Sequence, residues 1–324
     1  MIKAYDEDNF ICLFLFLSLI SCNSVSKREE KIAEVKVDFK TIRFDRLFAE
    51  AAPKELPQLK EKFPYLFPKQ FSDSVWIHKM KDTIQLEINR EVEKRYPDFS
   101  ESEDEFYSLF QHVKFYFPDF EVPDVITVTS EVDYKNKTIY TGDYLFVSLD
   151  TYLGQEHKFY IGIVDYFKRN FTKDQLVPDA ANSIAEEYVP RPKSRTFLAN
   201  MVYYGKLLYL KDIWLPELSN WRKMGYTEQQ WQFAEENEEM IWRYFVDNEL
   251  IFDTDSNLAP RFLYPAPFSK FYLSLDPQTP DRIGQYIGWQ IVKSYMDKNE
   301  VSIEEMLQAD AEIIFNNANY KPKK

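Results

Sequence analysis

The fold of this chain is decided by residues 177–216, which have the sequence VPDAANSIAEEYVPRPKSRTFLANMVYYGKLLYLKDIWLP. Apolar residues recur at spacings of three and four in both halves of this stretch, which is the period of an α-helix. Pro190 and Pro192 separate the two halves, and proline disfavours a continuing helix because it lacks an N–H and its ring crowds the preceding turn. The stretch therefore predicts two helices joined by a proline-containing hinge.

The two predicted helices differ in how much of their surface is apolar. In the first helix, Ala181, Ile184 and Tyr188 share one face, whereas Glu186 and Glu187 point elsewhere. In the second helix, residues 197–209 form two neighbouring apolar stripes that cover most of the circumference. A helix of this kind is typical of a protein core. We therefore expect a buried helix pair at the centre of the molecule.

A short helix with acidic residues beside a buried helix is the layout of zinc peptidases. Two histidines at i and i+4 bind the metal there, and the glutamate after the first histidine acts as general base. If Glu187 stands for that base, Glu186 and Pro190 occupy the two histidine positions. One residue earlier, Ala185 and Val189 occupy them. Neither alignment supplies an imidazole.

The position of the third zinc ligand also lacks a suitable residue. In the zinc peptidases whose third ligand is a glutamate, that ligand precedes a glycine on the next helix, and this chain has Tyr204 before Gly205. The three histidines, His78, His112 and His157, lie on separate segments without zinc spacing. We therefore expect no metal, no cofactor and no catalysis, and we take Glu186, Glu187 and Tyr204 as candidates for a degenerate site.

Composition limits the class of protein further. The chain has 324 residues, of which 45% are hydrophobic, and only 7 are glycine, which favours helices over glycine-turned β structure. The formal net charge is −13. Nucleic acids and anionic membrane surfaces both bind clustered lysine and arginine side chains. The negative net charge of this chain therefore argues against nucleic acid as a partner.

The first twenty-two residues have the pattern of an export signal. Residues 11–20, ICLFLFLSLI, form an apolar run of the length of a signal-peptide core and about half the length of a membrane span. Residues 19–22, LISC, follow the bacterial lipoprotein cleavage pattern, which predicts a signal peptide over 1–21 and lipid attachment to Cys22. The alternative is an ordinary secretory leader with a cysteine there by chance. Residues 22–30 then form a lipidated tether, and residues 31–324 a single domain.

The remaining patterns predict a mainly helical α+β fold. Strands are expected at 35–39, continuing toward 42–48, and at 125–129, 137–140 and 144–149, forming a small antiparallel sheet. Helices are expected at about 75–94, 102–115 and 227–247, and again in RIGQYIGWQIVKSYM, residues 282–296. Gly284 and Gly288 lie one turn apart in the last of these, where glycine costs about 1 kcal/mol relative to alanine. This spacing predicts a close approach of another backbone.

Taken together, the lipoprotein pattern, IRFDRLF at 42–48, MVYYGKLLYLKD at 201–212 and RIGQYIGWQIVKSYM make the chain resemble the family of gliding motility lipoproteins GldB. That family is similar to predicted zinc metallopeptidases with a glycine-containing helix late in the chain, which implies a zincin-like, degenerate metallopeptidase-like domain. The resemblance also implies a lipid-anchored protein of the cell envelope that is needed for gliding motility and type IX secretion. Since no acidic cluster directly follows Cys22, we expect it to face the periplasm.

Two hypotheses remain open at this point. In the first, the protein is not an enzyme and binds other components of the gliding and secretion machinery in a peptidase-derived cleft. In the second, it is an envelope hydrolase or peptidase-like enzyme with an atypical site, which keeps hydrolytic activity by other means through Glu186 and Glu187. The missing imidazoles favour the first hypothesis.

Overall fold

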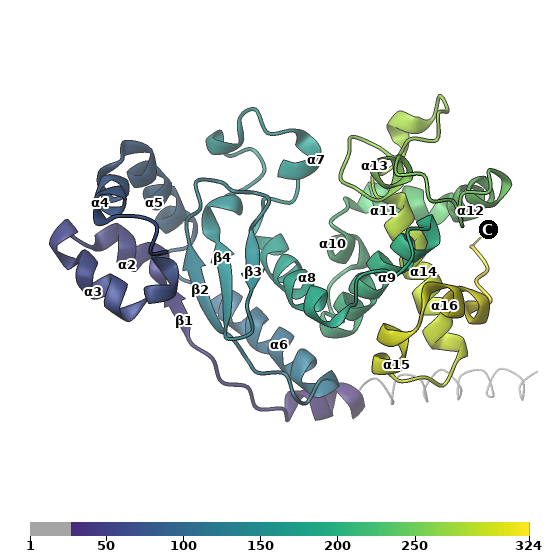
Figure 1. Ribbon diagram of the computed structural model, residues 1–324, viewed down its shortest axis with the longest axis horizontal. Coiled ribbons are helices and arrows are strands. Elements are labelled where there is room, and N and C mark those ends of the chain that lie inside the picture. Colours follow the sequence, from purple (N-terminus) through teal and green to yellow (C-terminus); the bar gives the residue numbers. More distant parts are fainter. Residues whose placement is uncertain (1–26, 324) are drawn as a thin grey trace, which may run out of the picture.

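The computed structural model describes residues 27–323, so the predicted signal peptide and Cys22 lie outside the described residues. Strands lie at β1 Thr41–Arg43, β2 Asp124–Val128, β3 Thr138–Tyr140 and β4 Tyr144–Ser148. Helices lie at α2 Phe44–Glu50, α3 Leu56–Lys62, α4 Asp73–Lys81, α5 Thr83–Arg95, α6 Ser100–Tyr116, α7 Asp165–Lys168, α8 Leu176–Tyr188, α9 Phe197–Trp214, α10 Asn220–Met224, α11 Glu228–Glu236, α12 Glu238–Asp247, α13 Leu258–Phe262, α14 Ile283–Lys298, α15 Ile303–Gln308 and α16 Ala311–Ala318. The structure is thus a mainly helical α+β fold with one small sheet (Figure 1).

The sheet is mixed, and the prediction of an antiparallel sheet was wrong. Its strand order is β1-β2-β4-β3. β1 pairs with β2 and β2 with β4 in parallel, and only β3 and β4 pair antiparallel. The helices α2–α6 between β1 and β2 provide the long crossover that parallel neighbours require. After the short turn from β3 to β4, it is β4 that lies beside β2, which leaves β3 at the edge.

The first predicted strand was also misplaced. Residues 35–40 have no regular secondary structure, the strand covers only Thr41–Arg43, and α2 begins at Phe44. The alternation of apolar and polar residues at 35–39 has a different cause: Val37 and Phe39 pack on the main core, and the ring of Phe39 lies edge-on to Phe110 at 5.1 Å. An extended segment lying on a core therefore shows the same period-two pattern as a strand.

Two predicted helices are each divided into two. The helix expected at 75–94 is interrupted at Asp82, whose carboxylate accepts a hydrogen bond from the Gln85 backbone N–H and so caps α5. The helix expected at 227–247 is interrupted at Asn237, between α11 and α12. Its predicted start is confirmed, because Thr227 and Gln230 form a capping box.

The two faces of the sheet pack against different helices. Ile126 packs with Phe44, Phe48 and Phe67 in a smaller cluster beneath α2–α4, and Tyr144 and Phe146 border it. Alternate residues of the same strands, Val125, Leu145 and Val147, belong to the main core on the other side. In Figure 1, α6 and α8 lie on that second side, and the helices from α9 onward extend away from it.

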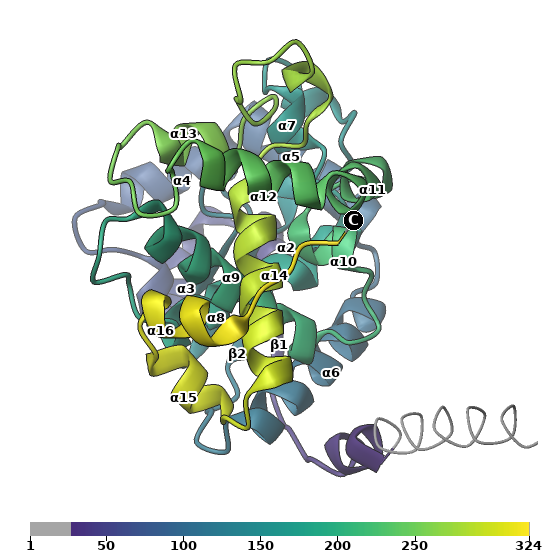
Figure 2. The ribbon, with the colours of Figure 1, turned by 90° about the vertical axis from the view of Figure 1, so that its right-hand side faces the viewer.

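The main core is organised around α9 and α14, which cross closely (Figure 2). Thirteen of the 18 residues of α9 are buried, so it is a core helix. At the crossing, a Cβ added to Gly288 would lie 1.9 Å from the Met201 carbonyl oxygen, and one added to Gly205 would lie 2.3 Å from the Gly288 carbonyl oxygen. Since real Cβ atoms do not approach this closely, only glycine fits both positions. No helix of the described residues is long and apolar enough to span a membrane.

Candidate functional site

Two of the three candidate residues line the same cleft. Glu186 on α8 and Tyr204 on α9 both border a cleft of about 290 Å³, which we call the interhelix cleft. The cleft lies between α8, α9, the end of α10 and the start of α14. Its charged and polar lining residues include Asp179, Asn182, Glu186, Tyr204, Lys211 and Arg282. The third candidate, Glu187, is exposed and does not line it, because consecutive helical residues diverge by about 100°.

One face of α8 provides the acidic side of the cleft. Asp179, Asn182 and Glu186 are spaced by three and four residues, so they share this face. Asn182 donates a hydrogen bond of 2.9 Å to the Glu186 carboxylate. Asp179 accepts hydrogen bonds from the Lys137 ammonium and, at 2.9 Å, from the Tyr152 hydroxyl. The spacing of polar residues in DAANSIAE is a signal from which sequence reasoning could have found Asp179 and Asn182.

One face of α9 provides the opposite side. Tyr204 and Lys211 are seven residues apart, or two turns, and Leu207 and Leu208 line the cleft between them. Burial raises the pKa of Tyr204 to about 12, and the nearby Tyr264 hydroxyl adds to this shift. Burial lowers the pKa of Lys211 to about 8, because an ammonium loses hydration when it leaves water.

Sequence reasoning missed Lys211, although it is the most unusual group in the cleft. Only 5% of its surface is exposed, and its ammonium makes no hydrogen bond or ion pair with any residue in 27–323. In sequence it appears as an ordinary lysine near the end of a helix, where lysine normally extends into solvent. A lysine on a helix that is apolar over most of its circumference was the available signal.

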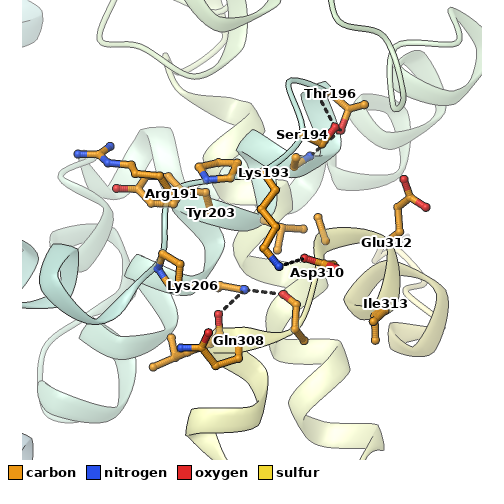
Figure 3. A pocket seen from close by; sticks show the side chains of 17 residues that line it. Arg191, Lys193, Ser194, Thr196, Tyr203, Lys206, Gln308, Asp310, Glu312 and Ile313 are labelled. Carbon is orange, nitrogen blue, oxygen red and sulfur yellow. Dashed lines mark hydrogen bonds and ion pairs between the residues drawn. The ribbon is translucent and has the colours of Figure 1, made fainter.

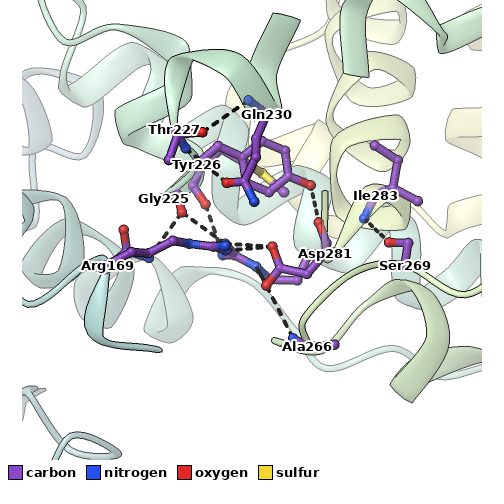
Figure 4. A network of polar contacts seen from close by, with 12 residues as sticks. Arg169, Gly225, Tyr226, Thr227, Gln230, Ala266, Ser269, Asp281 and Ile283 are labelled. Atoms are coloured by element: carbon purple, nitrogen blue, oxygen red, sulfur yellow. Dashed lines mark hydrogen bonds and ion pairs between the residues drawn. The ribbon is translucent and has the colours of Figure 1, made fainter. Parts of the chain in front are cut away.

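A buried polar network forms one wall of the cleft (Figure 4). Asp281 is fully buried and forms two ion pairs, one of 2.6 Å with Arg169 and one of 3.2 Å with Arg282. Arg282 also donates to the carbonyl oxygens of Met224 at 2.9 Å and Gly225 at 3.1 Å. These contacts tie the start of α14 to the loop after α10, so the wall is held by charged hydrogen bonds rather than by apolar packing.

A second pocket of about 400 Å³ lies on another face of α9 (Figure 3). It is bordered by the hinge at 190–196 and by residues 307–313. Its buried lysine, Lys206, donates hydrogen bonds of 2.8 Å to the carbonyl oxygens of Leu307 and Ala309. Burial lowers the pKa of Lys206 to about 8 as well. The two lysines thus have similar burial, but only the ammonium of Lys206 has hydrogen-bond acceptors within the described chain.

The donor set of the cleft does not resemble that of a zinc site. Within residues 27–323 there is no group of three or more His, Cys, Asp or Glu side chains that could hold a metal ion. His112 contacts Glu29, and His157 contacts Glu91, far apart in the fold. The i and i+4 positions of α8 that face the cleft hold Asn182 and Glu186, an amide and a carboxylate. What the cleft offers chemically is one buried ammonium that has no partner among residues 27–323, two tyrosine hydroxyls and a carboxylate at its rim.

Comparison with known proteins gives one match. The model of a family described as gliding motility protein GldB matches residues 25–322, which covers nearly the whole chain and confirms the resemblance seen in the sequence. No curated protein and no solved structure gave a significant match.

Proposed function

The chain belongs to the gliding motility protein GldB family, and from this premise we propose that it is a cell-envelope lipoprotein that acts in gliding motility and type IX secretion. Lipid on Cys22 anchors it to the membrane, and residues 31–324 face the periplasm as a single domain. The family supports the role in gliding motility. The sequence pattern LISC supports the anchor, and the net charge of −13 supports a protein partner rather than a nucleic acid.

We further propose that the protein acts by binding a component of the motility or secretion machinery in the interhelix cleft, and that it is not an enzyme. The observation that carries this proposal is the make-up of the cleft. Its polar groups come from α8, α9 and the wall around Asp281, and they include Lys211, a buried cation without a partner in the described part of the chain. The layout of α8 beside a buried α9 supports a zincin-like origin for this cleft, with the metal ligands lost.

A crosslinking experiment tests the binding role. A photoreactive amino acid is placed at Tyr204 inside the cleft, and in a matched strain at Tyr107, which is 40% exposed on α6, a helix that does not line the cleft. We expect the Tyr204 position to crosslink one envelope protein in intact cells and the Tyr107 position to leave that protein uncrosslinked. Equal crosslinking at both positions would contradict a role for the cleft.

The membrane anchor is tested separately. We expect Cys22→Ser to release the protein from washed membrane fractions and to abolish gliding while the domain stays folded. A serine variant that remains in the membrane fraction after detergent-free washing would contradict lipid anchoring. Protease treatment of intact cells tests the periplasmic orientation, because a periplasmic domain is protected by the outer membrane.

The alternative function is an envelope hydrolase with an atypical site. It is supported by Lys211 rather than by the expected residues Glu186 and Glu187. Glu186 and Glu187 do not meet in the cleft. Lys211, with a pKa of about 8, is neutral in roughly a tenth of molecules at pH 7 and would be the base or nucleophile of such an enzyme. If the protein hydrolyses a member of a hydrolase substrate panel and Lys211→Met abolishes this activity, the result would favour this alternative.

A further inference from the structure

The interhelix cleft contains one lysine ammonium that has no hydrogen-bond or ion-pair partner among residues 27–323. Lys223 lines the same cleft, but its ammonium pairs with Asp212 at 2.7 Å. Arg282 pairs with Asp281 and also donates to two carbonyl oxygens. Lys211 is the lining cation whose ammonium has no partner among residues 27–323. The three donors of its ammonium are therefore available to a ligand.

The acidic residues of the cleft do not provide that partner. Asp179 already accepts hydrogen bonds from Lys137 and the Tyr152 hydroxyl. Glu186 lies at the exposed rim and accepts its hydrogen bond from Asn182. The negative charges of both acids offset the positive charge of Lys211 at longer distances. An anion is therefore attracted to the ammonium of Lys211 only when it is close to it.

We propose that the interhelix cleft binds a ligand through one carboxylate group, which accepts hydrogen bonds from the ammonium of Lys211. This inference rests on the proposed binding function and names the chemistry of the bound group. A buried charge without a partner is unstable, and an anion that pairs with it removes that penalty. A carboxylate carries one negative charge, which matches one ammonium without a partner. A phosphate dianion would bring a second negative charge close to Asp179 and Glu186, and the other lining cations, Lys223 and Arg282, already pair with Asp212 and Asp281.

The shape of the cleft limits the rest of the ligand. Lys211 and Tyr204 are seven residues apart on α9, which corresponds to about 10.5 Å along the helix axis. The hydroxyl of Tyr204 makes no hydrogen bond with any residue in the described part of the chain, and Leu207 and Leu208 line the space between. An extended peptide covers this length with about three residues. The cleft therefore accommodates either the last residues of a protein chain, with its terminal carboxylate on Lys211, or a smaller carboxylic acid.

Lysine side-chain NMR on the purified full-length protein tests the proposal. The Cε signal of Lys211 is assigned by its loss in Lys211→Met, and Lys206 on the same helix is the matched control because its ammonium is held by Leu307 and Ala309. The probes are acetate, acetamide, inorganic phosphate, and a trialanine peptide as the free acid and as the C-terminal amide.

We expect acetate and the peptide acid to shift the Lys211 signal saturably and to raise its pKa, because an anion favours the ammonium form. Acetamide and the peptide amide should cause no shift, and the Lys206 signal should not respond to any probe. Peptide acid binding at least tenfold more tightly than acetate would support a protein C-terminus, and equal affinity would support a small acid. A Lys211 signal that responds to no carboxylate, responds equally to the amides, or prefers phosphate would overturn the proposal.

Failure of this inference is distinguishable from failure of the proposed function. If Lys211→Met removes carboxylate binding in solution while cells that carry the variant still glide, the carboxylate site is correct and the cleft is not needed for motility. If carboxylates do not bind and the Tyr204 crosslink still captures an envelope protein, the cleft binds its partner through other groups.

Discussion

Replacing Lys211 by methionine should make the protein more stable near neutral pH. Methionine has a similar length and volume to lysine but no charge. It therefore retains the apolar contacts of Lys211, which is only 5% exposed. What disappears is an ammonium without a partner in the described chain. The change therefore isolates the cost of burying that charge.

The magnitude follows from the pKa of Lys211, which burial lowers from 10.5 to about 8. Each unit corresponds to about 1.4 kcal/mol, so the charged form costs the folded state about 3 kcal/mol. Asp179 on α8 opposes this shift, whereas Arg282, Lys137 and Lys223 add to it. We expect Lys211→Met to raise the free energy of unfolding by about 2 to 3 kcal/mol at pH 7.

The sign of the pH dependence is fixed by linkage. Because the pKa of Lys211 is lower in the folded state, the unfolded state binds more protons between pH 8 and 10.5, and stability rises with pH across this window. The penalty is complete below pH 8 and absent above 10.5. The difference in stability between Lys211→Met and the wild type should therefore be largest at pH 7 and should vanish near pH 10.5. Urea unfolding followed by tryptophan fluorescence at a series of pH values measures this difference.

Lys206→Met is the control, and it should gain less stability than Lys211→Met. Burial lowers the pKa of Lys206 as well, but removing its ammonium leaves the carbonyl oxygens of Leu307 and Ala309 without their donor. The lost hydrogen bonds should make Lys206→Met less stable than Lys211→Met by about 1 to 3 kcal/mol. If the two variants have equal free energies of unfolding, then Lys211 has an internal partner, and the reasoning that makes it a free cation is refuted.

Three further predictions concern the helix crossing, the polar wall and the lost site. Gly288→Ala should cost more than about 3 kcal/mol of stability, because backbone stands in the way, whereas Gly284→Ala meets mainly movable side chains and should cost about 1 kcal/mol; equal thermal melts for the two variants would contradict this ranking. Asp281→Asn should cost about 3 to 5 kcal/mol, since it leaves two buried guanidinium groups without their counter-charge, and urea unfolding showing less than about 1 kcal/mol would contradict that role. The dialysed protein should contain no stoichiometric zinc by elemental analysis, and the Glu186→Gln, Glu187→Gln double variant should fold and support gliding; bound zinc, or a folded variant that does not glide, would favour the enzyme hypothesis.

Local patterns in the sequence determined the central helices. The hinge prolines fix where α8 ends, because proline acts on its own backbone and its immediate neighbour. Thr196 fixes where α9 begins, because its side chain accepts a hydrogen bond from the Ala199 backbone N–H. The apolar circumference of α9 predicted its burial for a similar reason, since a helix without a polar face has no side to present to water. Family membership could also be predicted, because a long motif such as RIGQYIGWQIVKSYM is one contiguous segment of the sequence.

The tertiary structure alone decided the strand order and the contents of the cleft. Strand pairing joins residues far apart in sequence, so β4 could take the place beside β2 without any local signal. The same holds for Lys211, whose sequence neighbours would let it reach solvent. It is buried because α8, α10 and the wall formed by Arg282 and Asp281 close around it, and each of these elements comes from a different part of the chain. Burial, and therefore the pKa and availability of that ammonium, is a property of elements that meet only in the folded protein.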